Sequence, residues 1–448
     1  MSKKSIRFVD IKKKLNKEKT DKLNKGKTRK NICQAPQGMH DIVFDEKKIF
    51  DKVVQEIYNI ACFYGYEQII TPILEYGDLF VYGLGKDNKD LNGMFWIKNC
   101  KNKKLALRLE GTIPIVRAFL EHNMSLFLQP TKIFYIGPFF NNTELYKAGF
   151  EIIEDDNIIN DVELIWLSKI ILQDLNLDNV RIELNSIGCP KCFKNYEKAI
   201  KKYYRSKKNR LCASCRKYLD SNILMLLNCQ EENCRALRVE APKIKDFLCT
   251  DCKNNLQNIT QYLKDMHIPF VLNPELVLRD NYYNKTIWSF VYDNIISEDN
   301  KETIVLAYGG RQDNLLKLFT GQNKPITGLV LNIYDIVNVL KTHKLLDVRN
   351  KIPNFFLMPV GETAKKKSFE ILEELRKNDI KILFSFGKDS VRSQMKFADK
   401  IKTKYILLLG QEEVNRNEII LQEASSELQE NIPLPKLIKV LKNKLNNA

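Results

Sequence analysis

The stretch KIFYIGPFFNNTELYKAGFEII, residues 132–153, decides the fold of the first part of this chain. Its apolar, aromatic and β-branched ends, 132–136 and 149–153, predict two strands that pair as an antiparallel hairpin. Gly137 and Pro138 predict a break after the first strand, because proline has no N–H to donate to a sheet. The hairpin therefore indicates a sheet in which neighbouring strands are antiparallel.

Segments on both sides of the hairpin extend this sheet and cover it with helices. Residues 46–63 place apolar side chains at helical spacing and predict an amphipathic helix. Further helices are predicted at 110–122 and 161–174, strands at 65–74, 105–109, 180–187, 285–293 and 303–308, and a strand leading into a helix at 327–340. The predicted fold class is α+β, with a mixed, largely antiparallel sheet flanked by helices.

The region after residue 350 has a different order of elements. Strands predicted at 355–360, 380–386 and 405–410 alternate with helices at 363–377 and 390–402, which predicts a small α/β domain behind a linker near 343–353. The predicted parts of the chain are a tail (1–34), a first part of the core (35–185), a cysteine-rich insertion (186–258), a second part of the core (259–349) and the C-terminal domain (350–448).

Composition narrows the class of protein. Hydrophobic residues make up 44% of the 448 residues and charged residues 28%, which excludes a wholly disordered chain. No uninterrupted apolar run approaches the roughly 18 residues of a membrane-spanning helix, so we expect no membrane partner. The lysine-rich N-terminus lacks the apolar segment of a secretory signal, so we expect a cytoplasmic protein.

The positive charge is concentrated at the N-terminus. The chain carries a net charge of +17, and residues 1–30 hold 13 Lys/Arg against 3 Asp/Glu. Such a tail favours a polyanionic partner, because basic residues on phosphates release condensed counterions. A solvated, disordered tail is the alternative interpretation. A mitochondrial transit peptide fits less well, because the tail is Ser-poor and contains Asp10, Glu18 and Asp21.

Eight of the 11 cysteines lie in four close pairs within one short region. The pairs are Cys189 with Cys192, Cys212 with Cys215, Cys229 with Cys234, and Cys249 with Cys252. Two such pairs complete a tetrahedral Cys₄ site, so we expect one or two structural zinc ions, and the sequence leaves the pairing open. Disulfides are disfavoured in a reducing compartment, and four pairs together are unusual for redox chemistry. A zinc-dependent hydrolase is excluded, because four thiolates leave no open position on the metal.

Seven segments, in this order, resemble histidyl-tRNA synthetase, a class II aminoacyl-tRNA synthetase. They are PQGMHDI (36–42), YGYEQIITPILE (64–75), LRLEGTIPIVRAF (107–119), YIGPFF (135–140), LVLRDNYYNKT (276–286), YGGRQDNL (308–315) and SVRSQMKFADK (390–400). The resemblance implies ATP- and Mg²⁺-dependent activation of histidine, followed by transfer to tRNA(His). It also implies the class II antiparallel sheet, a C-terminal anticodon-binding domain and a homodimer formed through residues 64–75. The cysteine-rich insertion resembles one found in some bacterial members.

The resemblance also implies roles for individual residues. Glu110 and Thr112 match positions that hold the α-amino group of histidine, and Glu151 matches the residue facing the imidazole. Tyr282 and Tyr283 match the tyrosines that line the side-chain site. Two arginines, Arg311 and Arg279, are candidates for the ATP phosphates. Three residues of the C-terminal domain, Arg392, Gln394 and Lys396, are candidates for binding the anticodon loop, where basic and polar side chains suit phosphates and base edges.

Three positions depart from the family at expected arginines. Asn141 stands at one, in a segment where the family's loop over ATP is also shortened, and Leu278 and Asp335 stand at the other two. Losing one preorganised electrostatic donor typically costs about 3–4 kcal/mol of transition-state stabilisation. Asp335 in addition reverses the sign of the charge next to phosphate. We therefore expect adenylation to be weak or lost.

Two functions are compatible with these features. One is a histidine–tRNA ligase with divergent ATP motifs. The other is a non-catalytic paralogue that binds tRNA or histidine as a regulator, such as the regulatory subunit of ATP phosphoribosyltransferase. That subunit needs no anticodon-binding domain, so the retained region 350–448 argues against it.

Overall fold

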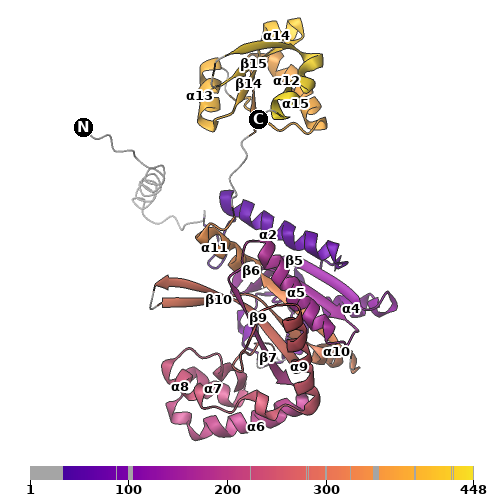
Figure 1. The fold of residues 1–448 in the computed structure, drawn as a ribbon, viewed down its shortest axis with the longest axis vertical. Helices are drawn as coiled ribbons and strands as arrows, with labels where there is room; N and C mark the ends of the chain where they lie inside the picture. Colours follow the sequence, from indigo (N-terminus) through magenta and orange to yellow (C-terminus); the bar gives the residue numbers. More distant parts are fainter. Residues whose placement is uncertain are drawn as a thin grey trace, which may run out of the picture. The chain divides into compact units, whose positions relative to one another are not determined.

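The computed structural model describes residues 34–446, except 87, 99–103, 222, 279, 281, 298–299, 323, 347–352, 388–389, 425 and 427. The chain forms two compact units that divide between Val348 and Arg349 (Figure 1). Residues 1–33 of the predicted tail and 347–352 of the predicted linker lie outside the described residues. No helix of the described part is long and apolar enough to cross a membrane.

An eight-stranded sheet forms the centre of the first unit, in the order β1–β5–β6–β11–β10–β9–β7–β8. Its strands are β1 (Glu67–Gln68), β5 (Thr131–Asn141), β6 (Thr143–Ile153), β7 (Val180–Gly188), β8 (Val271–Leu272), β9 (Asn284–Ser297), β10 (Asn300–Arg311) and β11 (Ile326–Asn332). The short edge strand β1 pairs in parallel with β5, and the edge strand β8 pairs in parallel with β7. All other neighbouring strands of this sheet are antiparallel. The predicted α+β class is confirmed.

The hairpin of β5 and β6 is longer and tighter than the sequence predicts. The two strands pair from Thr131 opposite Ile153 to Asn141 opposite Thr143, so that Asn142 alone makes the turn. The break predicted at Gly137 and Pro138 is wrong. Beyond the short β1, the outer side of β5 needs no ladder hydrogen bond, and a proline is tolerated at such an edge.

Alternation of side chains along β5 supplies two hydrophobic cores on opposite faces of the sheet. Phe134 joins the core covered by α2 (Phe44–Phe63), α5 (Ile159–Asp174), α9 (Thr250–Asp265) and α11 (Ile333–His343). Its neighbours Ile133 and Tyr135 join the core that includes α3 (Gly77–Leu84), α4 (Thr112–Glu121) and α10 (Asp313–Thr320). A three-stranded sheet of β2 (Leu74–Tyr76), β4 (Lys104–Leu107) and β3 (Trp96–Lys98) leads into α4.

The cysteine-rich insertion is helical and has its own core. Its elements are α6 (Pro190–Ser206), η3 (Lys208–Arg210), α7 (Ala213–Ser221), η4 (Ile223–Leu226), α8 (Glu232–Val239) and η5 (Ile244–Phe247), followed by α9. Buried cysteines pack there with aromatic and aliphatic residues such as Tyr196, Tyr204 and Leu219. In Figure 1, α6, α7 and α8 gather at one end of the first unit.

The second unit contains a five-stranded sheet, in the order β13–β12–β14–β15–β16. Its elements are β12 (Phe355–Pro359), α12 (Glu362–Lys377), β13 (Ile382–Phe384), α13 (Val391–Ile401), β14 (Tyr405–Leu409), α14 (Gln411–Arg416), β15 (Glu418–Glu423), β16 (Gln429–Pro433), η6 (Leu434–Lys436) and α15 (Leu437–Asn446). Strands β12, β13 and β14 are parallel, as expected for strands joined by helices. The antiparallel strands β15 and β16 were not predicted from the sequence.

Candidate functional site

Glu110 lies between β4 and α4 and binds the first turn of that helix. Its Oε2 accepts a hydrogen bond from the N–H of Thr112, and its Oε1 accepts one from the N–H of Ile113, both at 2.7 Å. Burial, with a contribution from the nearby Asp280, raises the pKa of Glu110 to about 7, although the two amide bonds oppose the shift. This carboxyl group can therefore exchange a proton near neutral pH.

Glu151 is held against Glu110 through Thr112. The hydroxyl of Thr112 donates to Glu151 Oε1 at 2.8 Å, and both side chains are fully buried. Burial raises the pKa of Glu151 well above its usual value. Its second oxygen, Oε2, is buried without a hydrogen-bond partner among the described residues. A buried acceptor without a partner is costly, so this oxygen points to a site for a ligand donor.

A glycine and a glutamine lie beside that free oxygen. Gly328 stands opposite Glu151 in the pairing of β6 with β11. A Cβ atom at Gly328 would lie 2.1 Å from Glu151 Oε2 and 2.5 Å from Gln312 Nε2, so only glycine leaves room for both groups. The amide of Gln312 is also buried without a partner in the described part of the chain. Sequence reasoning assigned no role to Gln312, although it lies in the matching segment 308–315, because only the folded sheet brings it next to Glu151.

Four tyrosines and Asp280 complete the cluster. Tyr282 and Tyr283 are both 5% exposed, and their ring centroids are 4.9 Å apart. The hydroxyl of Tyr282 donates to Asp280 Oδ2 at 3.2 Å. Burial and the charge of Asp90, on η1 (Lys89–Gly93), raise the pKa of Asp280 to about 6.

The other two tyrosines, Tyr135 and Tyr308, interact electrostatically with the acids of the cluster. A Cβ at Gly111 or Gly149 would lie 2.1 or 2.2 Å from Tyr135 Cζ, so both glycines are needed to seat this ring. We call the set of Glu110, Glu151, Asp280, Tyr135, Tyr282, Tyr283, Tyr308 and Lys147 the acid–tyrosine cluster.

Lys147 is the cation of the acid–tyrosine cluster, and sequence reasoning missed it. It lies on β6 and donates from Nζ to Tyr308 Oη at 3.3 Å. Burial lowers its pKa, but Tyr308, Asp280 and Glu110 more than compensate, so the pKa is raised and the side chain is charged. The signal in the sequence was its spacing of four from Glu151, which places both side chains on one face of a strand.

Arg311, predicted to bind phosphate, is engaged by the protein itself. Its side chain is 1% exposed, and its Nε lies 2.8 Å from Asp161 Oδ1. The terminal nitrogens donate to the backbone carbonyls of Asp155 and Asp156 at 3.2 Å. This placement favours a structural role and does not support phosphate binding. The second candidate, Arg279, lies outside the described residues.

The hairpin turn at Asn142 lies where the family has its loop over ATP, which the sequence predicts to be short in this chain. The N–H of Asn142 donates to the carbonyl of Gly93 at 2.8 Å, and that of Glu144 to the carbonyl of Gly38 at 3.0 Å. A Cβ at Gly93 would lie 1.8 Å from Asn141 Oδ1. The turn is therefore fixed against two other segments, and the described chain contains no loop between β5 and β6.

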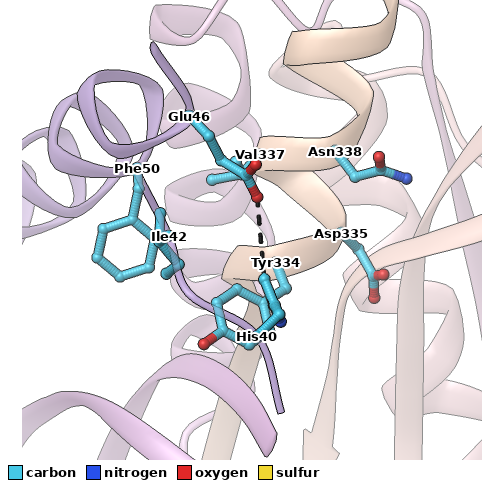
Figure 2. Close-up of a pocket in the computed structure, with 8 residues that line it drawn as sticks. All are labelled: His40, Ile42, Glu46, Phe50, Tyr334, Asp335, Val337 and Asn338. Atoms are coloured by element: carbon cyan, nitrogen blue, oxygen red, sulfur yellow. Dashed lines mark ion pairs between the residues drawn. The ribbon is translucent and has the colours of Figure 1, made fainter. Parts of the chain in front are cut away.

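Asp335 lies in the first turn of α11 and lines a cavity of about 250 Å³ (Figure 2). Across the cavity, His40 Nε2 lies 3.8 Å from Glu46 Oε1, and the His40 ring lies against Tyr334 with centroids 4.8 Å apart. Burial raises the pKa of Asp335, and Lys147 opposes the shift. Two carboxylates, those of Asp335 and Glu46, line this cavity. The resemblance predicts an arginine at the position of Asp335. Leu278, at the third expected arginine, packs against the core beside α4.

The eight paired cysteines form two groups. Cys189 and Cys192 meet Cys249 and Cys252, whereas Cys212 and Cys215 meet Cys229 and Cys234. Within each group the sulfur atoms all lie within 4.8 Å of one another, and none of the eight is in a disulfide. The structure therefore resolves the pairing that the sequence left open, and each group can hold one metal ion.

Backbone amides surround these sulfur atoms. The N–H of Cys249 donates to Cys192 Sγ at 3.1 Å, and the N–H of Cys212 donates to Cys234 Sγ at 3.3 Å. Such bonds orient and stabilise thiolate ligands.

The three anticodon-binding candidates divide between two faces of α13. Arg392 and Lys396 are four residues apart and exposed, so they lie on one face of the helix. Gln394 is fully buried, and its Nε2 donates to the carbonyl of Pro359 at 2.8 Å. This bond ties α13 to β12, which gives Gln394 a positioning role within the second unit.

Comparisons with known proteins give the same result over both units. The family model described as histidyl-tRNA synthetase matches residues 38–336, and that described as anticodon binding domain matches residues 354–444. The histidine–tRNA ligase of Caldanaerobacter subterraneus subsp. tengcongensis is 30% identical over 421 residues, which cover 92% of this chain and all of the relative. That of Dehalococcoides mccartyi strain CBDB1 is 32% identical over 423 residues, with the same coverage.

Two solved structures show the same architecture. The apo histidyl-tRNA synthetase of S. aureus superposes with a TM-score of 0.76 at 27% identity, over 91% of this chain and 99% of that one. A Bacillus halodurans C protein, titled an ATP phosphoribosyltransferase regulatory subunit/histidyl-tRNA synthetase, gives a TM-score of 0.61 at 18% identity, over 85% of this chain and 99% of its own. At that identity the second likeness concerns the fold alone.

Proposed function

Because this chain belongs to the histidyl-tRNA synthetase family, we propose that it binds histidine and tRNA(His), and that its ATP-dependent activation of histidine is weak or lost. The observation that carries the second part is the hairpin turn. Asn142 alone connects β5 to β6, and its N–H is bonded to Gly93. A turn fixed in this way offers no arginine and no loop to hold the phosphates of ATP.

The amino-acid end of the site supports histidine binding. Glu110 and Asp280 supply carboxylates for an ammonium group, because charge-assisted hydrogen bonds to carboxylates are among the strongest in proteins. Glu151 Oε2 has no hydrogen-bond partner among the described residues, and a ring nitrogen of an imidazole fits it. Tyr282 and Tyr283 close the site with aromatic faces.

The nucleotide end lacks the matching cations. Asp335 and Glu46 line the cavity beside α11, and carboxylates repel a triphosphate. Arg311 is paired with Asp161, so its guanidinium is engaged. ATP is a substrate of the family reaction and Mg²⁺ its cofactor, but the described residues do not fit tight binding of a triphosphate.

Two structural zinc ions fit the two groups of cysteines. The donor set of four thiolates is the one zinc prefers in closed sites, where the metal stabilises a fold and takes no part in catalysis. Thiolate sites of this kind persist in a reducing compartment, so the proposal places the protein in the cytoplasm.

A homodimer is part of the proposal. Apolar side chains are exposed along residues 64–75, the segment that the family uses for dimerisation, among them Ile70 at 83%, Ile73 at 47% and Leu74 at 45%. Clustered exposed apolar residues mark protein interfaces. Light scattering coupled to size-exclusion chromatography tests this assembly, and a monomer at micromolar concentration would exclude it.

Three measurements test the proposed function. Isothermal titration of the purified protein should detect histidine binding, and filter binding should detect a preference for tRNA(His) over unrelated tRNAs at physiological salt. Histidine-dependent ATP–pyrophosphate exchange should run at least about 100-fold slower than in a family member with all three arginines, the usual effect of losing electrostatic donors. Exchange at the rate of that member would exclude weakened activation. Absence of histidine binding would exclude the amino-acid site.

A regulatory subunit of ATP phosphoribosyltransferase is less well supported. The second unit matches the anticodon-binding family over residues 354–444, which a regulator of that enzyme does not need. The described residues therefore favour a protein that engages tRNA.

A further inference from the structure

Lys147 carries a positive charge that no carboxylate of the described chain contacts directly. Its hydrogen-bond partner in the structure is the neutral hydroxyl of Tyr308, at 3.3 Å. No carboxylate oxygen of the described chain lies within 4.0 Å of its Nζ. An ammonium group has three donors, and a partly buried one that contacts no anion is costly. Glu110 and Asp280 act on Lys147 from a greater distance, so among the described residues its ammonium group has no direct ionic contact.

The other basic side chains near the acid–tyrosine cluster are engaged elsewhere. Arg108 donates from Nε to the carbonyl of Pro138 at 2.7 Å and from Nη1 to the carbonyl of Thr71 at 3.0 Å. Arg311 is paired with Asp161, which lies on α5. Within the described part of the cluster, Lys147 is the cation that remains available to a ligand.

The position of Lys147 on β6 suits one end of a small zwitterion. Lys147, Gly149 and Glu151 are two residues apart and therefore share one face of the strand. The Cα atoms of Lys147 and Glu151 are about 13 Å apart. Glu110 and Asp280 are close enough to Lys147 to raise its pKa. The cluster thus presents an acceptor at Glu151, carboxyl groups at Glu110 and Asp280, and a cation at Lys147.

We propose that Lys147 Nζ holds the α-carboxylate of the bound amino acid. This inference rests on the proposed function and deepens it. A free amino acid carries an ammonium and a carboxylate, and each needs an opposite charge once it leaves water. Glu110 and Asp280 serve the ammonium group, and Lys147 serves the carboxylate. Tyr308, which bonds Nζ, is a positioning residue for Lys147.

A comparison of histidine with histidinol tests this role. Histidinol keeps the imidazole and the ammonium group but has a hydroxymethyl group in place of the carboxylate. We expect Lys147→Met to weaken histidine binding by about 10- to 100-fold in isothermal titration, the usual range for a hydrogen bond to a charged group. Histidinol binding should change by less than about threefold, because it offers no anion to Lys147.

The matched control is Lys132→Met. Lys132 is also a partly buried lysine of this sheet, on β5, but it pairs with Glu163 at 2.8 Å outside the cluster. We expect this variant to bind both ligands as the wild type does. Thermal melts of both variants with and without ligand show whether each is folded.

Each outcome decides the assignment. A selective loss of histidine affinity in Lys147→Met supports it. Equal losses for histidine and histidinol, or no loss for either, overturn the role of Lys147 and leave the proposed function standing. If the wild-type protein binds neither ligand, the proposed function itself fails, and the assignment of Lys147 fails with it.

Discussion

The hydroxyl of Thr112 donates a 2.8 Å hydrogen bond to Glu151 Oε1, which joins the start of α4 to β6 across 39 residues of chain. Thr112 also binds Glu110 through its backbone N–H. One residue thus fixes two acids from different elements. Because Oε1 of Glu151 is used in this way, Oε2 is left to receive a ligand. The arrangement makes the site sensitive to small changes around Glu151.

Gly328→Ala tests that sensitivity. The new Cβ would lie 2.1 Å from Glu151 Oε2, so the carboxylate must move away from the ligand position. We expect histidine affinity to fall at least about tenfold in isothermal titration, the effect of roughly 1.4 kcal/mol. The control is Gly387→Ala, where the added methyl would meet nothing within 4 Å. Unchanged affinity in Gly328→Ala would contradict the placement of the ligand at Oε2.

Histidine binding should depend on pH between 5 and 8. The pKa of Glu110 is about 7 and that of Asp280 about 6, both raised by burial. The ammonium group of histidine binds the ionised carboxylates. As the pH falls below about 7, Glu110 becomes protonated and must lose that proton before histidine binds, so affinity should fall by about tenfold per pH unit. Titrations of the wild type and Glu110→Gln measure this. A slope identical in both would exclude Glu110, since the imidazole of histidine titrates in either case.

The same two groups affect the stability of the protein without ligand. Their usual pKa values are 4.5 and 3.8, so the unfolded chain releases these protons at lower pH than the folded protein does. Between about pH 4 and 7 the folded state binds more protons, and these groups therefore contribute less stability as pH rises. We expect Glu110→Gln to reduce this loss in thermal melts. A wild-type and a variant curve that remain parallel would contradict it.

Metal content should follow the two groups of cysteines. We expect two zinc ions per chain in the wild type and one in Cys192→Ser or Cys234→Ser, which remove a ligand from different groups. Elemental analysis of the purified protein counts the ions. Cys62→Ser is the control, because Cys62 is exposed and belongs to neither group. One zinc ion in the wild type, or loss of both ions in either variant, would contradict two independent sites.

The exposed face of α13 should bind tRNA through charge. The double variant Arg392→Gln with Lys396→Gln should lower tRNA(His) affinity and reduce the dependence of log affinity on log salt by about 1 to 2 units. The control is Arg376→Gln with Lys377→Gln, which removes the same charge from α12. Equal effects of the two double variants would mean that only net charge matters. The variant Gln394→Ala is expected to act on stability and not on charge. It should lower the thermal stability of the C-terminal unit, because it removes the hydrogen bond from Gln394 Nε2 to the carbonyl of Pro359.

Local patterns in the sequence predicted most of the elements and the candidate metal ligands. The apolar spacing of 46–63 is found in α2, and the strand and helix predicted at 327–340 are β11 and α11. The cysteine spacing identified all eight metal-site candidates, since thiols three or five residues apart can face one centre. The resemblance to a family supplied Glu110, Thr112 and Glu151, which the structure brings into contact.

Only the tertiary structure decided which charged or polar side chains are available to a ligand. Arg311 and Gln394 belong to matching motifs, yet Asp161 and Pro359 engage them from distant parts of the chain. Lys147 belongs to no motif, yet the packing of β6 leaves it charged and out of contact with every carboxylate of the part of the chain that the structure describes. The physical reason is that the availability of a buried group depends on its partners across the fold, and those partners are set by strand pairing and packing.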